Sequence, residues 1–247
     1  EAVARAERLV ERVLAAGGLV IPATAPEFPD KLRQCLRNQC PPLLFAAGHS
    51  ALLEAPSVAV VGTRTPSVQG KDLAEQCATL FAGHGTIVVS GGAQGVDMAA
   101  HLATLEAGGG TIVILPQGLL SFRPTPELGR GLEDGRVLLL SEFAPDAAWQ
   151  THAAVTRNAT ISALSGMVCV IEPQKVGGSI RTARLALAQG KRVLVHVAKG
   201  MDCVWQTLAS GGAEAVCNAD GMFDPDRLLQ AFAEGKVKPA QGLLSFY

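Results

Sequence analysis

The stretch Val58-Ala-Val-Val-Gly-Thr-Arg-Thr-Pro66 decides the fold, together with Val88-Val-Ser-Gly-Gly-Ala-Gln-Gly-Val-Asp97. Each is an apolar run, typical of a buried strand, that passes into a glycine-containing turn and then into a helical pattern. Because the carboxyl ends of parallel strands meet at one edge of a sheet, we expect the two turns to lie side by side. Their backbone N–H groups, with no Cβ in front of them, are predicted to face outward as a site for phosphate.

A regular alternation of strand and helix signals surrounds these two turns. The predicted strands are 58–61, 87–89, 111–115, 137–140, 167–171 and 193–197, and the predicted helices are 71–82, 96–107, 127–132, 153–164 and 180–188. The strands are continuous apolar runs, which indicates a sheet buried on both faces. Apolar residues make up 48 % of the chain and aromatic residues only 4 %, which favours helices packed on a sheet over a β-sandwich. We therefore predict an α/β fold: an extended Rossmann-like, doubly wound, mostly parallel sheet with helices on both faces.

Three segments are predicted along the 247 residues. Residues 1–56 carry a helical pattern and two short strand signals, and we expect a small cap and lead-in. Residues 57–233 form the Rossmann-like domain, which ends in a weaker strand and helix pair at 213–216 and 224–233. Residues 234–247 are expected to be a linker-like tail.

Several classes of protein are disfavoured by composition. No apolar run approaches the roughly 18 residues of a membrane span, and the first residues have mixed charge instead of a signal-peptide pattern. The six cysteines form no Cys-x-x-Cys pair, and the five histidines have no metal-ligand spacing. We expect a reduced, cytoplasmic protein with no metal site, no cofactor and no membrane partner.

Charge is distributed unevenly along a chain whose net charge is −1. Between Thr151 and Gly200 the chain has seven Lys and Arg residues, and Glu172 is the only acid, so this segment is +6 and the rest is −7. Such a segment predicts a local surface for a polyanion. For Lys191 and Arg192 we favour a solvated helix face with no binding role.

Neither of the two standard phosphate motifs fits the first turn. A P-loop reading of Gly62 to Lys71 fails on glycine spacing and on Asp72, and no Gly-x-Gly-x-x-Gly follows the first strand. Gly62-Thr63-Arg64 still suits a phosphate through an amide, a hydroxyl and a guanidinium, although a simple strand-to-helix turn explains it equally well. The loop from Ser90 to Asp97 indicates close approach of a ligand more strongly, with Asp97 as a site residue or as an acid that stabilises the first helical turn.

A third turn of the same kind is Gly177-Gly178-Ser179-Ile180-Arg181-Thr182. Ser179 is expected to cap the following helix, or the amides there to receive a phosphate. Arg157 and Asn158 are predicted at the start of the preceding helix. Glu142 ends a strand, where a carboxylate suits a ribose, a base or a loop cap, and no nucleophile elbow or metal motif indicates catalysis.

In these motifs the chain resembles the DNA-processing protein A (DprA/Smf) family, the recombination mediators of bacterial natural transformation. The resemblance includes the lead-in Phe28-Pro-Asp-Lys-Leu32 and both glycine turns. It continues in order through Leu140-Ser-Glu-Phe143, Arg157-Asn158 and Gly178-Ser-Ile-Arg-Thr-Ala-Arg-Leu-Ala186. The family pattern usually reads Arg-Asn-Arg where this chain has Ala159, and many members carry a winged-helix module that we do not expect here.

The resemblance implies a non-enzymatic protein that binds single-stranded DNA, associates as a homodimer and loads RecA recombinase onto the strand during transformation and recombination. Carried onto this chain, the DNA-binding residues are Gly62, Thr63, Arg64, Ser90, Gly91, Gly92, Gly95, Asp97, Arg157, Asn158, Lys175, Gly178, Ser179 and Thr182. Phe122, Phe143 and Trp149 are candidate stacking faces for bases, or simple packing residues.

Two alternatives remain open. One is a nucleotide sensor or a phosphoribohydrolase-like enzyme of the same Rossmann superfamily, and the other is a module that only binds proteins. Such hydrolases carry a catalytic glutamate in Pro-Gly-Gly-x-Gly-Thr-x-x-Glu. The aligned stretch from Val176 to Arg184 lacks it and holds basic residues instead.

Overall fold

A single mixed sheet organises the protein, and the computed structural model describes residues 2–218 and 220–235. In that part of the chain the sheet has nine strands in the order β1-β2-β6-β5-β4-β3-β7-β8-β9. The strands are β1 (Leu19–Pro22), β2 (Leu43–Gly48), β3 (Ser57–Gly62), β4 (Ile87–Ser90), β5 (Thr111–Ile114), β6 (Val137–Ser141), β7 (Met167–Ile171), β8 (Arg192–His196) and β9 (Glu214–Ala215). All neighbours from β6 to β9 in this order pair in parallel, whereas β1 pairs antiparallel with β2 and β2 pairs antiparallel with β6.

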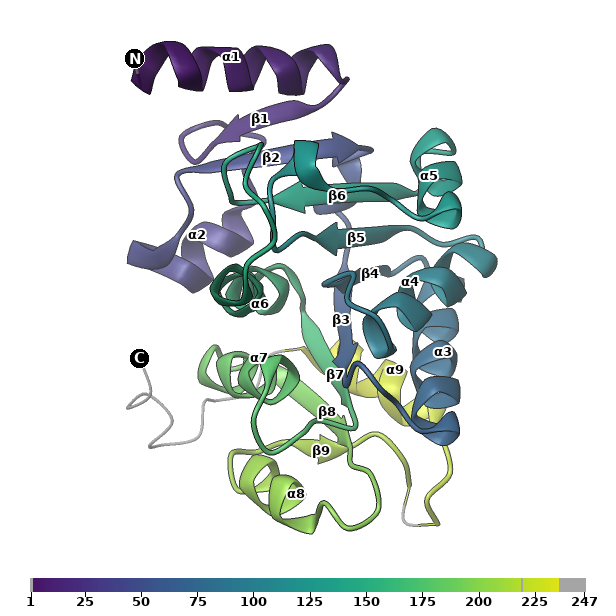
Figure 1. The fold of residues 1–247 in the computed structure, drawn as a ribbon. Helices are drawn as coiled ribbons and strands as arrows, with labels where there is room; N and C mark the ends of the chain where they lie inside the picture. The colour runs from purple at the N-terminus through teal and green to yellow at the C-terminus, as the bar shows by residue number, and fades with distance from the viewer. Residues whose placement is uncertain (1, 219, 236–247) are drawn as a thin grey trace.

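Helices cover both faces of this sheet (Figure 1). They are α1 (Ala2–Ala15), α2 (Asp30–Leu36), α3 (Val68–Gly83), α4 (Val96–Glu106), α5 (Pro126–Glu133), α6 (Thr151–Leu164), α7 (Gly178–Ala188), α8 (Asp202–Ala209) and α9 (Pro225–Glu234). Apolar residues of α2, α6, α7 and α8 pack on one face, and those of α3, α4, α5 and α9 on the other. The predicted doubly wound α/β fold is confirmed, although α8 was not anticipated.

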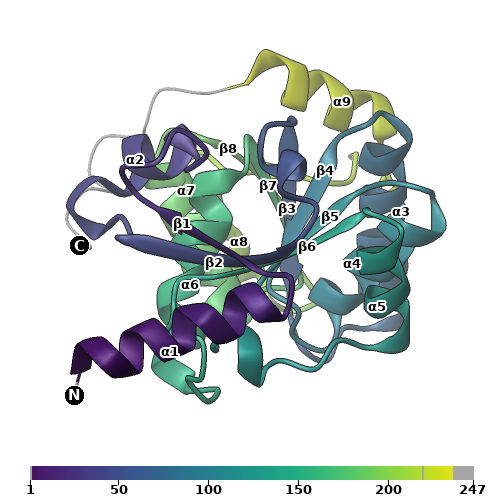
Figure 2. The ribbon, with the colours of Figure 1, turned by 90° about the horizontal axis from the view of Figure 1, so that it is seen from above.

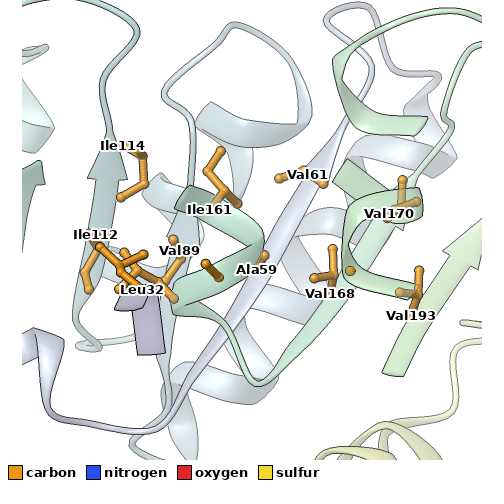
Figure 3. Close-up of a cluster of buried hydrophobic side chains, with 14 of the residues drawn as sticks. Leu32, Ala59, Val61, Val89, Ile112, Ile114, Ile161, Val168, Val170 and Val193 are labelled. Carbon is orange, nitrogen blue, oxygen red and sulfur yellow. The ribbon is translucent and has the colours of Figure 1, made fainter. Parts of the chain in front are cut away.

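The alternation of side chains along each strand divides the core into these two layers. Ala59 and Val61 of β3 point toward α6, where Ile161 meets them with Val168 and Val170 of β7 (Figure 3). Val58 and Val60 point to the opposite face. All residues of β7 are buried, which is why its sequence is an uninterrupted apolar run.

The N-terminal segment extends the sheet at one edge. Strand β2 pairs with β6, β1 pairs with β2, and α1 lies along these outer strands (Figure 2). Segment 1–56 thus shares one sheet with the rest of the fold, and the division into a cap and a DNA-binding domain at residue 56 stays a prediction. The predicted tail falls almost entirely on residues 236–247, outside the described part.

The chain reverses direction across the sheet at β3. It runs outward from β3 through β4 and β5 to β6, and then returns to the other side of β3 to form β7, β8 and β9. In an open parallel sheet, such a reversal leaves a crevice at the carboxyl ends of the central strands. None of the described helices combines the length and the apolar composition that a membrane crossing requires.

Lys191 corrects one expectation about the basic segment. Its side chain is buried, not solvated, and its ammonium donates hydrogen bonds to the carbonyl oxygens of Ser162, Ala163 and Ser165 at the end of α6. The Ser162 carbonyl also accepts a hydrogen bond from the backbone N–H of Ser165, the residue after α6. The lysine adds a charged donor to all three carbonyls and so ties the end of α6 to the start of β8. The same expectation is wrong for Arg192, which lies in strand β8 with its side chain 18 % exposed and forms ion pairs with Glu214 and Glu234.

We predict that Lys191→Met lowers the free energy of unfolding by about 3 kcal/mol, because it leaves three buried carbonyl groups without their charged donor. Urea denaturation measures this change. Lys71→Met is the control, since Lys71 is exposed and pairs only with Glu75 on the same helix, and its change is expected to stay within about 0.5 kcal/mol. Equal effects of the two substitutions contradict the capping role.

Candidate functional site

The three predicted turns and α6 meet at the crevice beside β3. Nine of the fourteen predicted site residues line one cavity of about 510 Å³, which we call the turn cavity. They are Gly62, Thr63, Arg64, Asp97, Arg157, Asn158, Gly178, Ser179 and Thr182. The turns bring residues more than 100 positions apart in the sequence into one wall.

Two further cavities adjoin the turn cavity and share parts of its wall. A cavity of about 230 Å³, the tryptophan cavity, is lined by Gly91, Gly92, Phe122 and Trp149, and it shares Arg64 and Arg157 with the turn cavity. On the other side lies a cavity of about 620 Å³, the Glu142 cavity, which contains Lys175. It shares Val155, Val176, Gly177 and Arg181 with the turn cavity, so the three cavities form a row.

Arg64 is exposed and stands between two of these cavities. Its guanidinium carbon lies 6.0 Å from the centre of the Trp149 ring, within the range of a cation–π contact. Trp149 is itself 47 % exposed, so an apolar ring and a cation are presented together.

The remaining two predicted residues hold the turns in place from within. Ser90 is fully buried, and its hydroxyl donates a hydrogen bond of 2.6 Å to the carbonyl oxygen of Val60. Gly95 has φ +83°, and a Cβ there would lie about 2.5 Å from the backbone of Thr63 and Arg64. Gly95 is therefore needed for the close approach of the first two turns, with no ligand involved.

The backbone amides of the first two turns are largely used within the protein. Thr63 N–H donates to the carbonyl oxygen of Ile171, Val96 N–H to that of Thr63, and Gly91 N–H to a carboxylate oxygen of Asp97 at 3.2 Å. The expectation that these amides face outward to a phosphate is wrong for these three positions.

Asp97 and Arg157 form a buried ion pair at the centre of the site. Their side chains are each 7 % exposed, and the nearest nitrogen and oxygen atoms are 3.8 Å apart. Burial raises the pKa of the Asp97 carboxyl, while Arg157 and the backbone of Ala93, Gly62 and Gly91 act in the opposite direction. Arg157 lies in the second turn of α6, not at its start as predicted.

The Arg157 guanidinium packs against Gly91, in the space that a side chain would otherwise fill. A Cβ at Gly91 would lie 1.7 Å from one guanidinium nitrogen, so a larger residue there would require Arg157 to leave its buried position beside Asp97. The glycine that suggested close approach of a ligand thus allows close approach of an arginine of the same protein.

Glu172 performs a similar task at the start of α3, a role that was not predicted from the sequence. Its carboxylate accepts hydrogen bonds from the N–H and the hydroxyl of Ser67, the residue that caps α3. Gly70 leaves the space for that carboxylate. Glu172 has φ +49°, a conformation that costs a non-glycine residue stability. A signal was available, because Glu172 is the only acid in the +6 segment.

The third turn differs from the other two. The residue before α7 is Gly177, which forms no side-chain cap, and the first turn of α7 contains no acid. The first amides of any helix lack intrahelical acceptors, so this end carries a partial positive charge toward the turn cavity. Ser179 lies within the helix and does not cap it, and Thr182 is buried, with its hydroxyl bonded to the carbonyl oxygen of Gly178.

Phe143 is not among the residues lining these three cavities, in contrast to Phe122 and Trp149. Within residues 2–218 and 220–235, no group of three or more His, Cys, Asp or Glu side chains is placed to hold a metal ion.

The strand order and the row of cavities at the carboxyl edge define the class: a Rossmann-type α/β protein with a cleft at the point where the sheet reverses. Residues 19–225 match the family described as DNA recombination-mediator protein A. The chain belongs to this family, and its role accordingly lies in DNA processing and recombination.

Similar proteins support this assignment over most of the chain. The DNA processing protein DprA of Bacillus subtilis is 32 % identical over 232 residues, covering 89 % of this chain and 77 % of the relative. Protein Smf of Escherichia coli is 34 % identical over 176 residues, covering 70 % of this chain and 46 % of the relative. The chain therefore spans about half the length of the Escherichia coli protein.

Solved structures agree with the fold. The X-ray structure of DprA from Streptococcus pneumoniae superposes with a TM-score of 0.72 at 28 % identity, covering 89 % of this chain and 75 % of that one. A DprA structure from Helicobacter pylori, described as showing a single-stranded DNA binding mode, gives 0.68 at 28 % identity, with 86 % and 96 % covered. A molybdenum cofactor binding protein from Rippkaea orientalis, at 17 % identity and a TM-score of 0.54 over 73 % of this chain and 96 % of that one, shares the fold alone.

His101, beneath the second turn, makes the stability of this region depend on pH. Its Nδ1 hydrogen-bonds the Thr111 hydroxyl at 2.7 Å, and its buried Nε2 has no partner among the described residues. Burial, with a smaller contribution from Arg157, lowers the pKa of His101 to about 3. As the pH falls below about 6.5, the unfolded chain takes up a proton at this residue and the folded protein does not, so stability is lost.

We therefore predict that, between pH 7 and pH 5, the wild type loses about 2 kcal/mol more unfolding free energy than His101→Asn. The asparagine amide retains a donor toward Thr111 but does not titrate. Denaturant titrations at each pH measure the difference. Parallel pH profiles of the two proteins contradict the assignment.

Proposed function

We propose that this protein binds single-stranded DNA along the row of three cavities, without catalysing a reaction. The observation that carries the proposal is the uncapped N-terminus of α7, which lies in the turn cavity together with Arg64 and Arg181. A helix N-terminus with flanking arginines suits a phosphate group. The acid nearest to it in the cavity, Asp97, is paired with Arg157 and does not oppose an anion.

The shape of the site favours a flexible single strand over a duplex. Hollows of about 230 to 620 Å³ admit one nucleotide unit or part of one, whereas the phosphates of a duplex lie on a wide, rigid cylinder. Phe122 and Trp149 offer faces for unpaired bases. A row of joined cavities suits a polymer better than a single mononucleotide.

The DprA structure from Helicobacter pylori, at 28 % identity, is described as showing a single-stranded DNA binding mode of that protein. This description supports the proposal of a single strand as the ligand. We extend the proposal to a homodimer that loads RecA recombinase onto the bound strand during natural transformation, in agreement with a family described as recombination mediators. A cytoplasmic location follows from that role.

We expect micromolar or tighter binding of a fluorescent oligo-dT, with affinity falling as salt rises, because bound phosphates release counterions. Arg64→Ala is expected to weaken binding by at least about tenfold and to reduce the slope of log Kd against log salt by about 0.7. Fluorescence anisotropy across a salt series measures both. Arg130→Ala is the control, since Arg130 lies on α5 and its side chain is 72 % exposed.

A second readout addresses RecA. RecA filament formation on an oligonucleotide coated with single-strand-binding protein is expected to accelerate in the presence of the wild type and much less with Arg64→Ala. Salt-independent binding of mononucleotides without binding of oligonucleotides contradicts the whole proposal. Strand binding without an effect on RecA limits it to a strand-binding role.

A further inference from the structure

The Glu142 cavity is lined by a carboxylate of which only one oxygen has a hydrogen-bond partner among the described residues. Glu142 follows β6 and lies against α6, where the Thr160 hydroxyl donates a hydrogen bond of 3.1 Å to one carboxylate oxygen, Oε2. The other oxygen, Oε1, is buried and has no hydrogen-bond partner among the described residues. Glu142 also forms no ion pair in the part of the chain that the structure describes.

An unpartnered buried acceptor is uncommon in a folded protein and calls for a donor from elsewhere. Burial raises the pKa of the Glu142 carboxyl, opposed by the Thr160 hydroxyl and by Arg157. The structure therefore does not supply enough donors to satisfy the ionised group. Because Oε1 is buried, the carboxylate has to turn toward the cavity before a ligand N–H group can supply one.

The other residues that line this cavity indicate the chemistry of such a ligand. Val155, Ala159, Ile180 and Ala188 give apolar surfaces, while Lys175 and Arg184 line the same cavity and are exposed. At about 620 Å³ the space is large enough for a purine or pyrimidine base with its sugar. A flat group with apolar faces, N–H donors on its edge and a phosphate at the mouth fits all these features.

The position of the cavity links it to the strand. It shares Val176, Gly177 and Arg181 with the turn cavity, next to the N-terminus of α7. A nucleotide whose phosphate lies at that helix end can direct its base past Val176 toward Glu142. This step depends on the proposed function, because it takes the strand to be bound at α7.

We propose that the Glu142 cavity is a base-selective subsite, which accepts a nucleobase bearing an exocyclic amino group and disfavours thymine. Cytosine, adenine and guanine present amino hydrogens that Oε1 can accept. The single N–H of thymine lies between two carbonyl oxygens, which would face the carboxylate lone pairs. Glu142 is then the specificity-determining residue, and Thr160 is the residue that orients it.

The test compares two labelled 12-nucleotide probes, oligo-dC and oligo-dT, by fluorescence anisotropy at pH 7.5. The wild type is expected to bind oligo-dC about five- to tenfold more tightly, the effect of one charge-assisted hydrogen bond against a repulsive contact. Glu142→Gln is expected to abolish or reverse this preference, because its amide can donate to a thymine carbonyl. Retention of the full oligo-dC preference in Glu142→Gln overturns the proposal.

A second variant protects the test against a folding defect in the first. Ala188→Leu fills the cavity from α7 and leaves Glu142 unchanged, and it is also expected to remove the preference for oligo-dC. Melting temperatures of both variants identify any loss of fold. Arg64→Ala, in contrast, is expected to weaken the binding of both probes by the same factor, so that the ratio of their dissociation constants is unchanged.

The outcomes separate this inference from the proposed function. Equal binding of both probes by the wild type overturns the base-selective subsite alone, and binding of neither overturns both proposals. Competition with free dCMP distinguishes the source of the base. Tight binding of dCMP by a protein that binds neither oligonucleotide assigns the cavity to a free nucleotide and overturns the strand-bound subsite.

Discussion

The arrangement of the cleft depends on carboxylates that the protein places at two of its own helix N-termini. Glu172 holds the start of α3 through Ser67, and Asp97 lies in the first turn of α4 and binds the Gly91 amide. Glu172 accepts hydrogen bonds from the N-cap residue of α3, Asp97 accepts one from the loop before α4, and each carboxylate complements the positive end of the helix dipole. A carboxylate of the protein thus already lies at both helix ends. The proposed anion site is the start of α7, where the preceding residue is a glycine without a side-chain cap.

Asp97 also fixes α6, the element that contributes to all three cavities. Arg157 extends from the middle of α6 onto Asp97 and lies against Gly91. Removal of either charged partner would leave a buried charge, which is strongly destabilising. The pair thus joins the second turn to α6. The Arg157 guanidinium occupies the space that a side chain at position 91 would need, which is why that residue is a glycine.

Much of the fold was predictable because it follows from strong local signals. Buried parallel strands give uninterrupted apolar runs such as Met167–Ile171, and the three glycine turns mark where strands end and helices begin. The weak points were α8, a helix of only eight residues, and the antiparallel pairing of β1 and β2 onto the sheet, a long-range contact that no local pattern encodes.

Most of the site residues predicted from the sequence line the cleft, but their contacts could not be predicted. The glycine turns and Arg157 were named from the sequence, yet their amides and guanidinium turned out to be used inside the protein. A sequence shows that glycine is needed at position 91 but not whether a ligand or the side chain of Arg157 occupies the space. The structural roles of Glu172 and Lys191 were not predicted for the same reason, because their partners lie 105 and up to 29 positions away.

These internal contacts have a consequence for binding. Lys191 fastens the end of α6, Asp97 fastens its middle through Arg157, and Thr160 orients Glu142 from its third turn. Because α6 is held at these points before any ligand arrives, a strand entering the cleft need not order this wall, and less binding free energy is lost to ordering. Arg64 and Trp149 at one side are exposed and contact each other. The cleft thus combines a wall held by internal contacts, which in the proposed function suits selection of a base, with an exposed cationic and aromatic edge, which suits a backbone of any sequence.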